Sequence, residues 1–341
     1  MQHLWRTVCC SWLLLALLWE ALLSAGARAA SQAQMPAPAP AFEFVALGDM
    51  PYSSPEVDRT PAFQRLIAAI NRLQPAFSIH VGDIKSGSTP CDDATFAKIH
   101  ALFMTFAQPL IYTPGDNEWT DCHRKTNGSY DPLERLAALR KLFFSASVSL
   151  GQTTLPLTRQ STVSDWKPMV ENVRWLAHGV LFVTLHVVGS NNNLRRHPAA
   201  AQEFFARNAA NLAWIEAAFR LAREEQALGM VLAMQADPGF QRRHGDGSGF
   251  KDVLDALAQH AAEFAKPVLI VHGDSHEFIF DQPLRHAASQ QLLPNVLRLE
   301  VFGEPQVHAV RVFVQPQDPM LFRVQPLFVL ENLLPLLQRA R

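Results

Sequence analysis

The stretch Val45-Ala-Leu-Gly-Asp-Met-Pro-Tyr52 closes an apolar run that begins at Phe42 and is interrupted only by Glu43. The run stops at Gly48-Asp49. A short apolar run bounded in this way indicates a buried strand of a parallel sheet, with a carboxylate at its C-terminal end. Because ligands of open α/β sheets bind just outside such strand ends, we expect Asp49 to lie at a functional edge.

The same pattern recurs three times along the chain. Apolar runs at 76–81, 109–113 and 267–272 lead into Gly82-Asp83, Gly115-Asp116 and Gly273-Asp274. One Gly-Asp after a strand is ordinarily only a turn, in which the glycine lets the chain change direction. Four of them predict carboxylates gathered at one edge of the fold. Such carboxylates repel one another unless a cation lies among them, so the pattern predicts a cation site.

The order and spacing of these blocks resemble the calcineurin-like metallophosphoesterases. Blocks of that family read Asp-x-His, Gly-Asp, Gly-Asn-His-Asp/Glu, a strand-end His and Gly-His-x-His. Here they read Asp49-Met-Pro51, Gly82-Asp83, Gly115-Asp116-Asn117-Glu118, Gln235 and Gly273-Asp274-Ser275-His276. The resemblance spans residues 42–276. It departs from the family where Pro51, Asn117, Gln235 and Asp274 replace histidines, and where Asp116 replaces an asparagine.

The resemblance implies a set of metal ligands. Asp83 would bridge two ions, and Asp49 with His276 would complete the shell of one. Asp116, Asp274 and Gln235 would hold the other. Oxygen donors favour Mn or Mg over Zn, so one or two ions of this kind are expected. A single-ion site stays open because Pro51 offers no donor. The neighbouring Tyr52 either compensates for it or only packs.

The resemblance also implies hydrolysis of a phosphate ester, with a metal-activated water attacking phosphorus. Asn117 stands at the position of the catalytic histidine and cannot act as an acid. His123, further along the same loop, is the predicted substitute, with a solvated surface histidine as the alternative. Lys85 and Arg124 are predicted to bind the anionic substrate. They are otherwise solvated charges, as are Arg242, Arg243 and His244. The alternative function is a non-catalytic descendant that binds a metal or an anion.

The amino-terminal segment has the pattern of a secretory leader. A basic start with Arg6 precedes an apolar run at 12–23 and Ala27-Arg28-Ala29. We therefore predict a signal peptide at 1–29, a flexible Pro/Ala-rich lead-in at 30–41 and a single domain at 42–341 in a secreted or periplasmic protein. The apolar run is short for a membrane span, although an uncleaved anchor is the alternative. A net charge of −1 gives no indication of a nucleic-acid partner.

Two cysteines remain after the predicted cleavage, Cys91 and Cys122. Both fall in loops that follow predicted neighbouring strands, after Asp83 and after Asp116. An exported protein meets an oxidising compartment, so this pair predicts one disulfide.

Strands and helices alternate through most of the chain, and a strand-rich segment follows. Helices are predicted at 199–225 and 250–264, a hairpin around His178-Gly179, and only loop at 145–167. Four strands at 278–280, 296–302, 308–314 and 321–324 are predicted to be antiparallel. The pattern predicts an α/β protein with two mixed β-sheets packed as a sandwich flanked by helices, like the four-layer fold of the resembled family. A doubly wound single sheet is the alternative.

Overall fold

The computed structural model describes residues 39–53, 57–194, 196–286 and 288–333. From residue 39 onward, the described residues form one compact unit. The predicted signal peptide at 1–29 and most of the predicted lead-in lie outside the described residues.

Twelve strands form two mixed sheets, which confirms the predicted fold class. The five-stranded sheet has the order β12-β11-β1-β2-β3. Its strands are β1 (Phe42–Leu47), β2 (Ser78–His80), β3 (Leu110–Tyr112), β11 (Ala309–Val314) and β12 (Phe322–Leu327). The three amino-terminal strands run parallel, whereas β11 is antiparallel to both β1 and β12.

The seven-stranded sheet has the order β4-β5-β6-β7-β8-β10-β9. Its strands are β4 (Thr158–Arg159), β5 (Val173–Ala177), β6 (Val180–Thr184), β7 (Gly229–Ala233), β8 (Val268–His272), β9 (Ile279–Asp281) and β10 (Val296–Glu300). The four central strands β6, β7, β8 and β10 are parallel. The predicted hairpin is present as the antiparallel pair β5–β6 around His178-Gly179.

The two sheets pack face to face through aromatic side chains. Phe44 of β1 meets Phe182 of β6 edge to face, with ring centroids 5.3 Å apart, and Phe77 meets the same ring at 4.9 Å. Each strand also buries its outer face: Val45 and Leu47 pack in the core under the amino-terminal helices, while Leu232 and Ile270 pack under the later helices. Burial on both faces explains why these strands read as continuous apolar runs.

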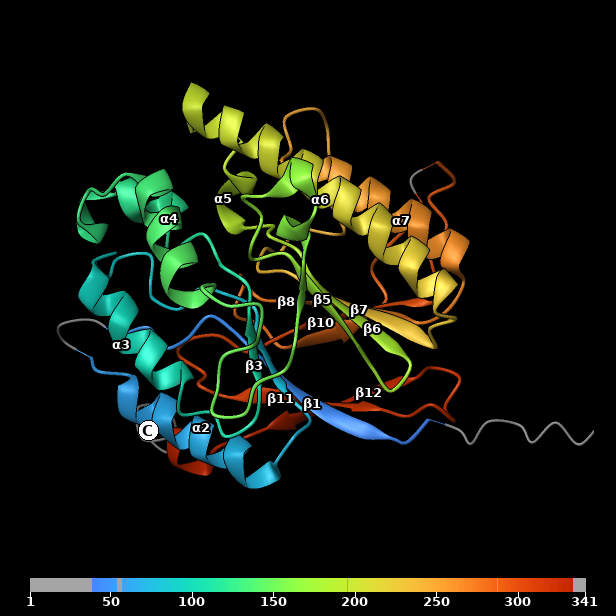
Figure 1. Ribbon diagram of the computed structural model, residues 1–341, viewed down its shortest axis with the longest axis horizontal. Helices are drawn as coiled ribbons and strands as arrows, with labels where there is room; N and C mark the ends of the chain where they lie inside the picture. Colours follow the sequence, from blue (N-terminus) through green and yellow to red (C-terminus); the bar gives the residue numbers. More distant parts are fainter. Residues whose placement is uncertain (1–38, 54–56, 195, 287, 334–341) are drawn as a thin grey trace, which may run out of the picture. The chain divides into compact units, whose positions relative to one another are not determined.

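Helices cover both outer faces and complete four layers (Figure 1). On the five-stranded sheet lie α2 (Thr60–Leu73), α3 (Asp93–Phe103) and α4 (Pro132–Phe143); on the seven-stranded sheet lie α6 (Pro198–Glu224) and α7 (Lys251–Phe264). The very short α5 (Gly189–Asn192) precedes α6. Single 3-10 turns are η1 (Thr120–His123), η2 (Lys125–Asn127), η3 (Gln160–Thr162) and η4 (Ser164–Trp166). Asp131 caps α4 by accepting hydrogen bonds from the next amides.

Two sequence predictions differ from the structure. The strand predicted at 296–302 pairs in parallel with β8 and is antiparallel only to β9. A parallel pair needs a crossover, and here β9 and a loop provide it where a helix is usual, so the absence of a helical pattern was misleading. The stretch 145–167 is not only loop, because β4 and two 3-10 turns lie in it. These pieces are too short to give a periodic signal.

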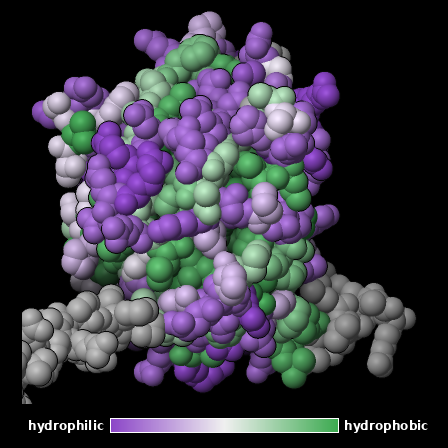
Figure 2. Space-filling model, turned by 90° about the vertical axis from the view of Figure 1, so that its right-hand side faces the viewer, coloured by the Kyte–Doolittle hydropathy of each residue, from purple (hydrophilic) through white to green (hydrophobic). Residues whose placement is uncertain are grey.

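The face viewed from the right-hand side of Figure 1 is largely hydrophilic, and its hydrophobic patches are separated by hydrophilic residues (Figure 2). Within the described ranges, no helix combines the length and the apolarity that crossing a membrane requires.

Candidate metal centre

The strand-end turns place their acidic residues in an unusual backbone conformation. Asp49, Asp83 and Asp274 have φ values of 52°, 53° and 82°, and His276 has 66°. An L-residue in this left-handed region is strained, although aspartate tolerates it better than most side chains. Strained residues that cluster at one place point to a functional site, because the surrounding structure must maintain them.

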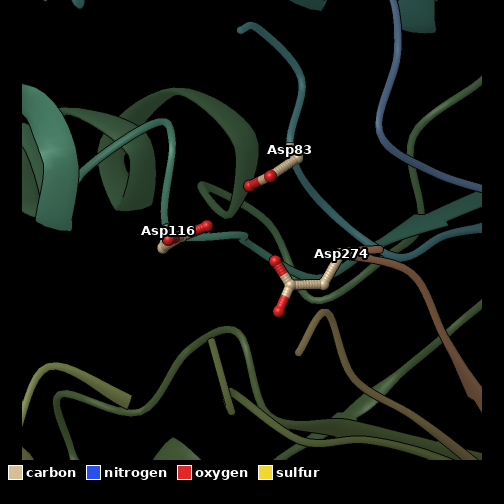
Figure 3. Close-up of side chains that lie close together, drawn as sticks. All are labelled: Asp83, Asp116 and Asp274. Atoms are coloured by element: carbon tan, nitrogen blue, oxygen red, sulfur yellow. The ribbon is translucent and has the colours of Figure 1, made fainter. Parts of the chain in front are cut away.

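Three carboxylates from both sheets point into one space. Asp83 follows β2, Asp116 follows β3 and Asp274 follows β8 (Figure 3). Each offers an oxygen that lies within 4.8 Å of the others. Asp83 and Asp116 come from the loops of the five-stranded sheet and Asp274 from the other sheet, so the space lies where the two sheets meet.

Asp49 and His276 lie directly beside these three carboxylates. The backbone amide of Asp274 donates to both Asp49 oxygens, at 3.1 Å each. His276 Nε2 is 3.7 Å from Asp49 Oδ1, and its Nδ1 is 2.7 Å from the carbonyl oxygen of Glu304. Because Nδ1 donates to that carbonyl, Nε2 is left as the free acceptor. The structure therefore brings together four aspartates and one histidine from the predicted ligand set.

Two glycines permit this close approach. A Cβ atom on Gly273 would lie 2.0 Å from Asp49 Oδ2, and one on Gly115 would lie 2.0 Å from Asp83 Oδ1. No side chain fits at such a distance. The glycines of the repeated Gly-Asp pattern are thus needed for contact between neighbouring turns as well as for the turn itself.

Tyr52 lies in the centre of the group. Its Oη is 3.0 Å from Asp83 Oδ2 and 3.4 Å from His276 Nε2. Burial, with the charges of Asp83 and Asp49, raises the pKa of the phenol well above its usual value. The tyrosine joins the two halves of the ligand set at the point where Pro51 has no donor.

Asn117 fixes Asp83. Its side-chain Nδ2 donates to Asp83 Oδ2 at 2.7 Å, and its backbone amide donates to Asp83 Oδ1 at 3.1 Å. The same Nδ2 lies 3.1 Å from Tyr52 Oη. The amide therefore orients the carboxylate that was predicted to bridge the ions.

The acidic group is electrostatically frustrated. Burial raises the pKa of Asp83 and of Asp49 well above the usual range, and repulsion from Asp116 or Asp274 adds to it. Burial and the charge of Asp116 raise the pKa of Asp274 to about 7. Among the described residues, no Lys or Arg forms an ion pair with these carboxylates, and the neutral ring of His276 is 3.7 Å from Asp49 Oδ1. A divalent cation would remove the repulsion, and the oxygen-rich donors fit a hard ion such as Mn²⁺ or Mg²⁺.

Two predicted site residues have other contacts. Gln235 Oε1 accepts from the Gly189 amide at 2.6 Å, so this acceptor is already used. Its Nε2 has no hydrogen bond of good geometry, yet it lies close enough to lower the pKa of Asp274. Lys85 is 1 % exposed, and its ammonium donates to the carbonyls of Ser86 and Asn117 at 2.8 and 2.6 Å. It therefore stabilises the loop, and the predicted substrate contact is not supported.

His123 and Arg124 lie exposed on the loop above the carboxylates. Arg124 pairs with Asp121 at 2.8 Å, and His123 Nδ1 is 2.8 Å from the Thr120 carbonyl. Both side chains remain accessible to a ligand at this edge. Their substrate and acid roles stay predictions.

The predicted disulfide between Cys91 and Cys122 is present, with Cα atoms 5.7 Å apart. It joins the loops that follow the neighbouring strands β2 and β3. Its sulfurs lie 3.6 and 3.8 Å from the Asn117 carbonyl oxygen. The bridge therefore supports the residue that orients Asp83.

Ser190 belongs to the site, although it was not among the residues predicted from the sequence. Its hydroxyl lies 2.7 Å from Asp116 Oδ2 and 3.1 Å from Asp121 Oδ1. Ser190 and the three asparagines after it all have φ between 52° and 65°. The buried guanidinium of Arg207 holds this segment by donating to Asn192 Oδ1. The available signal was a Gly-Ser-Asn run after an apolar run, at the position of a Gly-Asp turn.

Glu118 and His80 are buried supports of the turns. Glu118 Oε1 accepts from the amides of Gly115 and Asp83 at 2.7 and 3.2 Å. His80 Nε2 donates to the Met50 carbonyl at 3.0 Å, while its Nδ1 accepts from the Gly82 amide. Burial lowers the pKa of His80 to about 3, so the ring is neutral and links the first two turns.

Several solved structures are similar to this chain. A dimetal phosphatase from Danio rerio aligns over 85 % of this chain and 100 % of its own, with 11 % identity and a TM-score of 0.51. PhoD aligns over 82 % of this chain and 66 % of its own, with 13 % identity and a TM-score of 0.47. Purple acid phosphatase PPD1 from yellow lupin seeds aligns over 88 % and 56 %, with 10 % identity and a TM-score of 0.43.

No family model matches the sequence. No curated protein matches it either. The similarity to the dimetal phosphatase shows that the chain shares the fold of that protein, in agreement with the predicted two-sheet sandwich.

Proposed function

We propose that this protein is an exported hydrolase of phosphate esters that depends on one or two divalent cations, with Mn²⁺ or Mg²⁺ favoured. The observation that carries the proposal is the convergence of Asp83, Asp116 and Asp274 beside Asp49 and His276, without a Lys or Arg partner among the described residues. The bound cations would neutralise the phosphoryl oxygens and supply an activated water for attack on phosphorus.

The chain's own residues have separate tasks in this proposal. Asp83 presents a carboxylate whose orientation is fixed by Asn117. Tyr52 donates to Asp83 and keeps His276 Nε2 within reach of the same space. His123 would protonate the leaving group from the exposed loop, because the side-chain amide of Asn117 is too weak an acid to do so. Arg124 on the same loop would contact the anionic oxygens of the ester.

Export is proposed from two observations. The leader at 1–29 has the pattern of a signal peptide. The disulfide between Cys91 and Cys122 requires an oxidising compartment to persist, such as the periplasm or the cell exterior.

A second candidate function is non-catalytic binding of a metal or an anion. It is favoured by Asn117, which stands where the resembled family has its catalytic histidine and whose side-chain amide is engaged with Asp83 and Tyr52. The same carboxylates would then hold a cation without turnover.

Turnover of p-nitrophenyl phosphate by the mature protein with added Mn²⁺ separates the two. The proposal predicts metal-dependent hydrolysis that Asp83→Ala abolishes, with a smaller loss in Asn117→Ala, because the first removes a ligand and the second only its support. Asp165→Asn, at an exposed carboxylate, is the matched control. Bound metal with no hydrolysis of aryl or alkyl phosphates would contradict the hydrolase and favour the binding protein.

A further inference from the structure

A cavity of about 630 Å³ opens beside the carboxylate group. Asp274 and Ser275 form one part of its wall, and the loop after β7 forms most of the rest. That loop, residues 237–250, contributes Arg242 and Arg243 to the lining. The cavity therefore has an acidic end at the candidate metal centre and a basic wall further out.

The two arginines are not neutralised by neighbouring acids. Two acids that line a cavity with these arginines have other partners: Asp281 pairs with Arg298 at 2.5 Å, and Asp255 pairs with Lys251 at 2.9 Å. Asp237 Oδ1 accepts from the Gly239 amide at 2.8 Å. In the described part of the chain, neither Arg242 nor Arg243 forms an ion pair or a side-chain hydrogen bond. Both guanidinium groups are exposed and available to an anion.

The basic loop is held in place by its own polar contacts. His244 bridges it, with Nδ1 2.8 Å from Ser248 Oγ and Nε2 3.1 Å from the Gly239 carbonyl. Asn191 ties the far end to the segment that carries Ser190, because it donates to the Gly247 carbonyl and accepts from the Gly249 amide. His244 is thus a support of the loop, and the arginines are presented from a fixed backbone.

A second cavity of about 920 Å³ shares Arg242 and Arg243 with the first. The two arginines therefore line both cavities. A ligand with one end at Asp274 can extend along the first cavity to both arginines. The site therefore has room for a substrate larger than a small ester.

We propose that Arg242 and Arg243 bind a second phosphate group of the substrate. Two exposed arginines that line the same cavity and have no carboxylate partner in the described residues match the charge of a phosphate dianion, and each guanidinium can donate two hydrogen bonds to it. The preferred substrate class is therefore a compound that carries two phosphate groups. This inference rests on the proposed hydrolase function for the identity of the scissile ester.

Binding of phosphonates tests the inference without turnover, because their carbon–phosphorus bond is not hydrolysed. Linear alkane bisphosphonates with three to six carbons are compared with alkylphosphonates of the same length, by calorimetry on the Mn²⁺-loaded protein. We expect at least one bisphosphonate to bind roughly tenfold more tightly than its monophosphonate. In Arg242→Ala/Arg243→Ala this ratio should fall to about two or less. Arg223→Ala, at an exposed arginine of α6, should keep it.

The outcomes separate this inference from the proposed function. An equal ratio in the wild-type protein and the double variant would overturn the second phosphate site, since chelation of the metal alone does not depend on these arginines. A ratio that depends on the arginines, in a protein without phosphoesterase turnover, would support the site and contradict the hydrolase. Thermal unfolding of each variant verifies that the fold is kept.

Discussion

Buried carboxylates occur in two regions of this molecule, with opposite electrostatics. Glu171 is fully buried, but Arg140 and His186 contact it at 2.5 and 2.7 Å. Burial alone would raise its pKa, yet the charges and hydrogen bonds of Arg140 and His186 together outweigh burial and hold the pKa far below the usual range. At the metal edge, burial and repulsion raise the pKa of Asp83 and Asp274 together.

The difference shows what each region is built for. Around Glu171 the chain supplies its own cation and satisfies the charge, as a structural element requires. At the metal edge it places four aspartates together and supplies no Lys or Arg to pair with them among the described residues. A fold retains such a costly arrangement where a ligand compensates for it. Four aspartates placed together without a Lys or Arg partner among the described residues are therefore the clearest indication of function in this structure.

The largest expected effect on stability is at Glu171, whose charge is compensated by Arg140. Glu171→Gln leaves the partly buried Arg140 without its carboxylate, so we expect a loss of about 3–5 kcal/mol in the free energy of unfolding. Urea denaturation measures it, and the exposed Glu216→Gln on α6 is the control. Because the pair lies outside the ligand set, the Mn²⁺ affinity of the folded variant should stay near that of the wild-type protein. A stable Glu171→Gln protein would remove the contrast between the two regions.

The opposite result is expected at Asp274, and it depends on pH. Its folded pKa of about 7 lies above the ordinary value of 3.8. A raised pKa means that the stability present below about pH 4 is lost as pH rises through 7. Without metal, the wild-type protein should therefore lose on the order of 2–4 kcal/mol relative to Asp274→Asn between pH 4 and 8. Denaturation of both proteins in chelator across this range measures the difference, and parallel curves would contradict the account.

The metal edge could be predicted from the sequence, whereas the surroundings of Glu171 could not. The four aspartates and His276 could be predicted because apolar runs that end in Gly-Asp place their carboxylates at one edge, whatever the order of the strands. Glu171 and His186 carried no such signal, because their pairing depends on how β5, β6 and α4 pack. Lys85 is another example. A lysine in a loop is ordinarily exposed, and the sequence alone did not show that this one is buried.

The Ser190 segment shows a further limit. Four successive residues, 190–193, are left-handed. This run depends on tertiary contacts, which are the hydrogen bond from Arg207 to Asn192 and the one from the Gly249 amide to Asn191, and local preference alone does not predict it. The role of Tyr52 was also open, because a position next to a ligand does not fix the direction of its side chain. Its contacts with Asp83 and His276 are visible only in three dimensions.

The smallest expected effect concerns His123. If it protonates the leaving group, His123→Ala should lower kcat/KM for alkyl phosphates by about tenfold or more, with little change for p-nitrophenyl phosphate, whose leaving group needs no proton. The comparison of the two substrates within one variant cancels any change in metal content. Equal losses on both substrates would contradict the role of His123 as the acid that protonates the leaving group.

Equilibrium binding of Mn²⁺ to metal-stripped protein at pH 7 tests the central claim most directly. Wild-type protein, Asp83→Ala and the control Asp165→Asn are dialysed against the same series of Mn²⁺ concentrations, and bound metal is measured per chain. The account predicts one or two ions per chain for wild type and Asp165→Asn, with affinity reduced by about a hundredfold or more in Asp83→Ala. Equal Mn²⁺ binding by Asp83→Ala, or none by the wild-type protein, would contradict it.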